Sequence, residues 1–93
     1  MVEIQTKKLA DVYKALSNEN RIKILQYCED KELSVTELSS KLKISYTLTS
    51  EYITILEKQG LVKKTKKSDN KVKVKSLTHF KQNGELEILT PRM

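Results

Sequence analysis

The chain has one cysteine, one histidine, two glycines and one proline among its 93 residues. With Cys28 alone, neither a disulfide nor a thiolate metal cluster can form within one copy. These scarcities, together with the lack of a glycine-rich phosphate loop, leave no candidate catalytic set, so we expect neither enzyme activity nor a cofactor. No apolar run approaches the roughly 20 residues of a membrane span, and Met1-Val2-Glu3 does not begin a signal peptide, so we expect a cytoplasmic protein.

Cys28 has two interpretations. It follows Ile24 by one helical turn, and a free cysteine in such a place usually packs as a small buried hydrophobe. The alternative is a redox-sensing thiol or an inter-subunit disulfide, which is rare in the cytosol outside hyperthermophiles.

The segment from Lys58 to Lys81 is rich in lysine and almost free of acidic residues. Between Lys58 and Lys81 there are nine lysines and one acid, Asp69, a local balance of +8. Residues 1–57 and 82–93 each sum to −1, which gives the formal net charge of +6. A block of this kind is typical of a solvated surface, a disordered tail or a folded phosphate-binding element.

The pattern inside the block favours a folded element. Val72 and Val74 alternate with lysines, and a turn signal at 68–70 precedes them. Alternation next to a turn predicts a β-hairpin over residues 62–77 with a row of ammonium groups on its outer face.

Four helices are predicted ahead of this hairpin, at about residues 6–16, 19–30, 35–42 and 46–59. Helical spacing of apolar residues and the caps Asn18, Ser34 and Ser45 define them. Ser34 and Glu37 form a capping box, and Gly60 suits the left-handed position after the fourth helix. The short connection between the third and fourth helices predicts a helix-turn-helix. The fold class is therefore α+β, a winged helix-turn-helix, and residues 1–93 are expected to form one domain.

The segment from residue 78 onward fits a strand better than a helix. A helix would scatter its apolar residues around the axis. A hairpin with a loop at 82–84 instead places Phe80 opposite Leu86, and His79 and Lys81 opposite acids. A short helix stays the alternative.

The outward half of helix 46–59 is the predicted DNA-reading surface, because a recognition helix contacts base edges through its N-terminal outward residues. Leu48, Thr49, Tyr52, Ile53, Ile55 and Leu56 are predicted to pack inward. Threonine methyls suit thymine and Glu51 suits a cytosine amine. The predicted DNA-binding residues are Lys41, Lys43, Ser45, Tyr46, Thr47, Ser50, Glu51, Thr54, Lys63, Lys64, Lys66, Lys67, Lys71 and Lys73.

Three stretches resemble arsenic-repressor-type (ArsR/SmtB) winged-helix regulators. The first, residues 15–25, contains a leucine–serine pair, a helix cap, an arginine and an isoleucine–leucine pair. The second, residues 32–38, lies where that family has its third helix. The third, residues 50–62, resembles the recognition helix and ends in Gly60-Leu61-Val62. The resemblance covers roughly residues 9–78. It implies a dimeric winged helix that binds operator DNA and represses or activates transcription.

The chain also departs from that family. Ser34 and Thr36 stand where its metal sensors carry cysteines, and hydroxyls are poor ligands for soft metals, so we expect no metal. Tyr52 replaces the usual histidine of the recognition helix, which leaves its role open. The long C-terminal dimerisation helix is shortened or replaced. The residues expected at the dimer interface are therefore Leu9, Val12, Tyr13, Leu16, Leu86, Ile88 and Leu89.

These observations predict a homodimeric, sequence-specific regulator that binds a palindromic operator on double-stranded DNA. Helix 46–59 would lie in the major groove and the lysine-rich wing on the backbone. The helix offers few base-reading side chains, so a non-specific architectural or protein-interaction module is the alternative.

Overall fold

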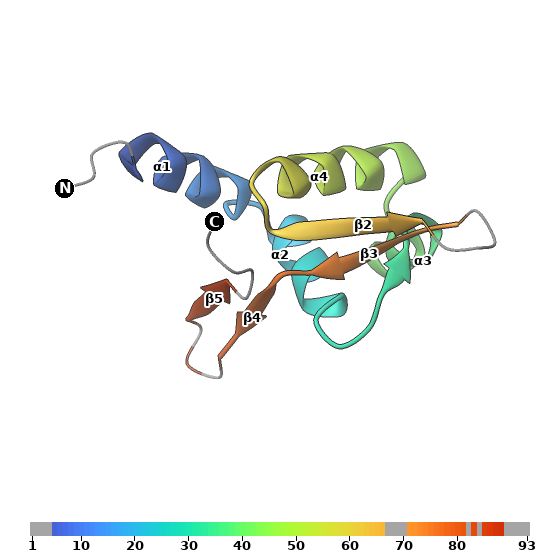
Figure 1. Cartoon of the computed structure of the whole chain (residues 1–93). Helices are drawn as coiled ribbons and strands as arrows, with labels where there is room; N and C mark the ends of the chain where they lie inside the picture. The colour runs from blue at the N-terminus through green and yellow to red at the C-terminus, as the bar shows by residue number, and fades with distance from the viewer. Residues whose placement is uncertain (1–4, 67–70, 82, 84, 89–93) are drawn as a thin grey trace.

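The computed structural model describes residues 5–66, 71–81, 83 and 85–88. The elements in that part of the chain are α1 (Gln5–Ala15), α2 (Glu19–Tyr27), β1 (Leu33–Ser34), α3 (Val35–Leu42), α4 (Tyr46–Lys58), β2 (Val62–Lys66), β3 (Val72–Ser76), β4 (Thr78–Phe80) and β5 (Leu86–Ile88). The α+β winged helix-turn-helix prediction is confirmed. Figure 1 shows α2, α3 and α4 beside the sheet, while α1 extends from one end.

The helices begin where the sequence supplies a cap. Asn18, Ser34 and Ser45 each accept a backbone N–H from the first turn of α2, α3 and α4. Ser34 and Glu37 complete the predicted capping box in both directions. Gly60 follows α4 with a φ of 75°, as predicted. These local hydrogen bonds satisfy N–H groups that the helices themselves leave unpaired.

The core gathers apolar side chains from the helices and from the base of the hairpin. Each of these residues removes its side chain from water, which stabilises the fold by about 1.5–3 kcal/mol for a leucine or an isoleucine. The largest fully buried apolar side chains are those of Ile24, Leu25, Leu38, Ile53, Leu56, Leu61 and Val74.

Helix α2 is shorter than predicted, since it ends at Tyr27 and not near residue 30. The Cys28 carbonyl oxygen accepts the Ser76 backbone N–H at 3.1 Å and Lys75 Nζ at 3.4 Å. Lys75 Nζ also donates to the Glu29 carbonyl oxygen. Because β3 supplies these donors, the carbonyls at the helix end are satisfied without a further helical turn.

Strands β1, β3 and β2 form an antiparallel sheet in that order. The sequence did not predict β1, because two residues are too few to display an alternating pattern. Its pairing places Leu33 opposite Val74 and Ser34 opposite Lys73. The wing is thereby joined to the residues that begin α3.

The predicted row of ammonium groups lies on one face of the wing, where Lys63, Lys73 and Lys75 fall together, but the other face carries lysines as well. Residues directly opposite each other on antiparallel strands share a face. Lys64 lies opposite the buried Val74, whereas Lys63 lies opposite Lys75. Lysines therefore project from both faces of the wing.

The C-terminal segment is a second hairpin, so the strand prediction is confirmed and the helix alternative is wrong. Strands β4 and β5 pair antiparallel with Phe80 opposite Leu86 and His79 opposite Glu87. The Lys81 N–H donates to the Glu85 carbonyl oxygen at 2.8 Å. Glu29 fastens this hairpin to the end of α2, because its carboxylate accepts the Phe80 N–H at 3.1 Å.

Two left-handed residues, Gly60 (φ 75°) and Lys43 (φ 59°), allow a matched test of backbone strain. A Cβ added at Gly60 would meet no atom within 4 Å. Gly60→Ala is therefore expected to lower the free energy of unfolding by about 1 kcal/mol, the cost of a left-handed backbone for a residue with a Cβ atom. Lys43→Gly is expected to raise the free energy of unfolding by up to about 1 kcal/mol, since glycine adopts the left-handed backbone without this cost.

Urea denaturation of both variants measures these changes. A Gly60→Ala protein as stable as the parent would contradict the need for a left-handed residue after α4.

Candidate nucleic-acid interface

The two elements predicted to contact DNA lie at the same end of the molecule. Figure 1 shows the N-terminal end of α4 and the far end of the β2–β3 hairpin at one end, with α3 beside them. Tyr46 of α4 and Lys71 and Lys73 of the hairpin line a common hollow. One bound duplex can therefore reach both elements.

Helix α4 divides into a packed face and an exposed face. Thr49, Ile53 and Leu56 are buried, while Leu48 and Tyr52 are half-buried. Ile55 was expected inside but is 38% exposed, so its placement on the packing face is wrong. Of the predicted reading residues, Tyr46, Thr47, Glu51 and Thr54 are exposed and Ser50 is half-buried.

The hydroxyl of Thr54 is already engaged within the helix. Thr54 Oγ1 donates to the Ser50 carbonyl oxygen at 3.0 Å. Its single proton is used in that bond, so this side chain offers a partner an acceptor lone pair and a methyl group.

The predicted wing lysines differ in how they are held. Lys63, Lys66 and Lys71 are exposed. Lys64 Nζ lies 3.2 Å from Glu57 Oε1 of α4, and Lys73 Nζ lies 3.6 Å from a carboxylate at the start of α3. Such surface pairs contribute little stability but hold the wing against both helices. Lys67 lies outside the described residues.

The residues at the helix-turn-helix turn have largely structural partners. Ser45 Oγ accepts the Leu48 N–H at 3.0 Å, so this side chain caps α4. The Lys41 ammonium lies 5.3 Å from the centre of the Tyr27 ring. Lys43 is exposed in the tight turn.

Tyr52 belongs to a contact that sequence reasoning missed. The Arg21 guanidinium lies 5.3 Å from the centre of the Tyr52 ring. Arg21 also donates through Nε to the Ala15 carbonyl oxygen at 2.6 Å and through Nη2 to the Lys14 carbonyl oxygen at 3.2 Å. Arg21 therefore joins the end of α1 to α4. The sequence signal that could have indicated this contact was the position of Arg21 within the family-like stretch 15–25.

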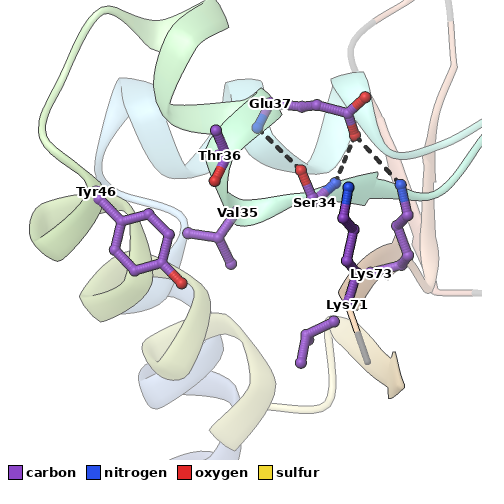
Figure 2. Close-up of a pocket in the computed structure, with 8 residues that line it drawn as sticks. Ser34, Val35, Thr36, Glu37, Tyr46, Lys71 and Lys73 are labelled. Carbon is purple, nitrogen blue, oxygen red and sulfur yellow. Dashed lines mark hydrogen bonds and ion pairs between the residues drawn. The ribbon is translucent and has the colours of Figure 1, made fainter. Parts of the chain in front are cut away.

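Glu37 connects the cap of α3 with the wing (Figure 2). Its Oε1 accepts the Ser34 N–H at 2.8 Å and lies 3.6 Å from Lys73 Nζ. The Ser34 N–H bond, and then the charge of Lys73, lower the pKa of Glu37 below its usual value, while desolvation opposes them. The carboxylate thus stays ionised where it meets the wing.

The Cys28 thiol is buried, and burial raises its pKa to about 12. Both features favour the packing interpretation, because a reactive cysteine needs access and a thiolate. The redox or inter-subunit disulfide interpretation stays a prediction, and these features weigh against it.

The predicted dimerisation residues of α1 separate into two kinds. Leu9 is 52% and Tyr13 is 63% exposed, whereas Val12 is 8% exposed and belongs to the chain's own core. Leu16 packs half-buried against that core. Leu86 and Ile88 lie in β5, and Leu89 lies outside the described residues.

Over the described ranges, no group of three or more His, Cys, Asp or Glu residues could hold a metal ion. Ser34, at one of the family's cysteine positions, uses its Oγ to accept the Glu37 N–H at 3.1 Å. His79 Nδ1 lies 3.0 Å from Glu29 Oε1. In the same ranges no helix is long and apolar enough to cross a membrane.

The helix-turn-helix, the exposed face of α4 and the adjoining basic wing define the class of a winged-helix DNA-binding transcriptional regulator. The chain belongs to the ArsR family, because residues 18–64, about half of its length, match the family described as "Bacterial regulatory protein, arsR family". This family consists of regulators and not of enzymes.

Relatives agree with this assignment. The chain is 36% identical over 85 residues to the transcriptional activator HlyU of Vibrio cholerae, covering 91% of this chain and 79% of that protein. The solved structure of HlyU from Vibrio cholerae N16961 gives a TM-score of 0.71 over 81% of this chain and 80% of that one. A homodimeric winged helix-turn-helix DNA-binding domain from Mycobacterium bovis, 23% identical, has the same fold, with a TM-score of 0.73 over 78% of this chain and 67% of that one.

The capping role of Glu37 predicts a pH-dependent stability. Because its pKa is lowered in the folded state, its contribution is present above the usual carboxyl pKa and is lost as the pH falls through the lowered value. Glu37→Gln is expected to lower the melting temperature at about pH 7 and to flatten the loss of stability toward about pH 3.

Glu51→Gln is the control, since Glu51 is an exposed glutamate of α4 away from any helix cap. Thermal unfolding at both pH values compares the two variants. Equal behaviour of the two variants would contradict the role of Glu37.

Proposed function

We propose that this protein binds operator DNA as a homodimer, without a metal ion, in the cytoplasm where it regulates transcription. The N-terminal half of α4 lies in the major groove, and the wing lies along the neighbouring backbone. One observation carries this proposal: Tyr46, at the start of α4, and Lys71 and Lys73 of the wing line the same hollow. A bound duplex would therefore contact the helix and the wing together.

The wing supplies most of the affinity in this proposal. Lysines that neutralise phosphates release counterions from the DNA, and the free energy of this release dominates binding at low salt. Lysines on both faces of the hairpin suit an element that follows the backbone at the edge of a groove, with phosphates on either side. Lys63, Lys66 and Lys71 are exposed, and we assign these contacts to them.

The exposed face of α4 supplies the sequence preference. Thr47 and Thr54 offer methyl groups, which suit the methyl group of thymine. Thr54 is the stronger candidate, since its hydroxyl proton is already donated to the Ser50 carbonyl oxygen. Glu51 is exposed on the same face and suits a cytosine amino group.

A homodimer would place two copies of α4 on successive turns of the major groove. Leu9 and Tyr13 form the exposed apolar part of α1, and Val12 supports them from the core. Strand β5 is proposed as the second part of the interface. The homodimeric relative from Mycobacterium bovis supports a dimer of this fold.

The backbone-binding role of the wing predicts a change in salt dependence. Lys66→Gln and Lys71→Gln are each expected to reduce the slope of log affinity against log salt by about 0.9, and together by about twice that amount. Lys8→Gln is the control, because Lys8 is an exposed lysine on α1. Fluorescence anisotropy with a duplex over a salt series measures the slopes. An unchanged slope in the double variant would rule out the wing as the backbone contact.

The dimer and its reading helix predict the outcome of selection from random duplexes. The expected product is a two-fold symmetric motif with half-sites about 10 base pairs apart.

Replacing the contacted thymine by uracil, which lacks the methyl group, should weaken binding about fourfold, the value of one buried methyl group.

Thr54→Ser keeps the hydroxyl but removes the methyl, so this variant should bind the thymine and uracil duplexes alike. Selection without any enriched motif would instead favour the non-specific architectural role.

A further inference from the structure

A hollow of about 470 Å³ separates the start of α4 from the wing. Its lining comes from four elements: the last residue of β1, the first turn of α3, the first residue of α4, and the beginning of β3 with the residue before it. Figure 2 shows Tyr46 on one side and the wing lysines on the other, with Val35 between them. The lining residues are Ser34, Val35, Thr36, Glu37, Tyr46, Lys71, Val72 and Lys73.

The chemistry of this hollow suits one phosphodiester group. Its lining carries two ammonium groups and one carboxylate, which leaves a net charge of +1. Glu37 does not repel an anion strongly, because its Oε1 is engaged by the Ser34 N–H and Lys73. A net charge of +1 matches the single negative charge of one phosphodiester.

Hydroxyl donors and apolar surface complete the site. Tyr46 is 59% exposed and Thr36 is exposed, so both hydroxyls are accessible to a ligand. Tyrosine, threonine and lysine side chains commonly bind phosphate oxygens in protein–DNA complexes, where they fix the register of the protein. Val72, which is 38% exposed, and the half-buried Val35 offer apolar surface for a deoxyribose.

We propose that this hollow holds one phosphate and the adjoining sugar of the DNA strand that runs from the major groove under α4 to the wing. Tyr46 and Thr36 donate hydrogen bonds to the phosphate oxygens, and Lys71 supplies the neutralising charge. Lys73 and Glu37 act as positioning residues that hold the wing at this distance from α3. This inference rests on the proposed function and adds the contact that sets the register of α4 on the duplex.

The test uses the full chain and a duplex in which one phosphate at a time is replaced by an uncharged methylphosphonate. On unmodified DNA, Tyr46→Phe is expected to weaken binding about tenfold, the value of one hydrogen bond to a charged group. In the parent protein, one methylphosphonate position in each half-site should weaken binding by a similar factor. At that position Tyr46→Phe should show little further loss, since its contact is already missing.

Tyr27→Phe is the matched control, because Tyr27 is an exposed tyrosine of α2 that does not line the hollow, and phenylalanine keeps the ring beside the Lys41 ammonium. It should behave as the parent at every position. Thr36→Val provides a second variant, on α3, and melting temperatures establish that all variants fold. Equal methylphosphonate losses in the parent, Tyr46→Phe and Thr36→Val would overturn the inference.

A last arm separates DNA phosphate from a free anion. Inorganic phosphate replaces chloride at constant ionic strength. We expect it to affect the parent and Tyr46→Phe equally, and a stronger competition in the parent would assign the hollow to a free anion and overturn the inference. Absence of any salt-dependent binding to unmodified duplex would instead reject the proposed function itself.

Discussion

The position of the wing relative to α3 and α4 depends on one short strand pairing, that of Leu33 and Ser34 with Val74 and Lys73. Ser34 is both the last residue of β1 and the cap of α3. The wing is therefore hydrogen-bonded to the same residue that starts the helix-turn-helix. Because α3 packs on α4, a displacement of β3 would carry the wing away from the start of α4.

Charged side chains reinforce that pairing at little energetic gain. Glu37 meets Lys73, and Glu57 meets Lys64, so two lysines of the wing are held by acids on α3 and α4. Exposed ion pairs of this kind contribute little to stability. They connect the hairpin with both helices without adding much stability.

Much of the architecture could be predicted because its signals are local. A cap such as Asn18 acts on N–H groups within one turn, and Gly60 acts on its own backbone. The pairing of Phe80 with Leu86 follows from alternation and loop length. The end of α2 and the two-residue strand β1 were missed, because both depend on donors and acceptors from β3, which lies far along the chain at residues 72–76.

The sequence by itself determined the helix starts, the class of fold and the concentration of positive charge in one hairpin, since each depends on neighbouring residues. Only the tertiary structure decided on which face of the wing each lysine lies, because sheet register places Lys64 and Lys63 on opposite faces. It also decided that Tyr46 and Lys71 share a hollow. Residues far apart in sequence meet there through strand pairing, and a local sequence pattern does not predict such a contact.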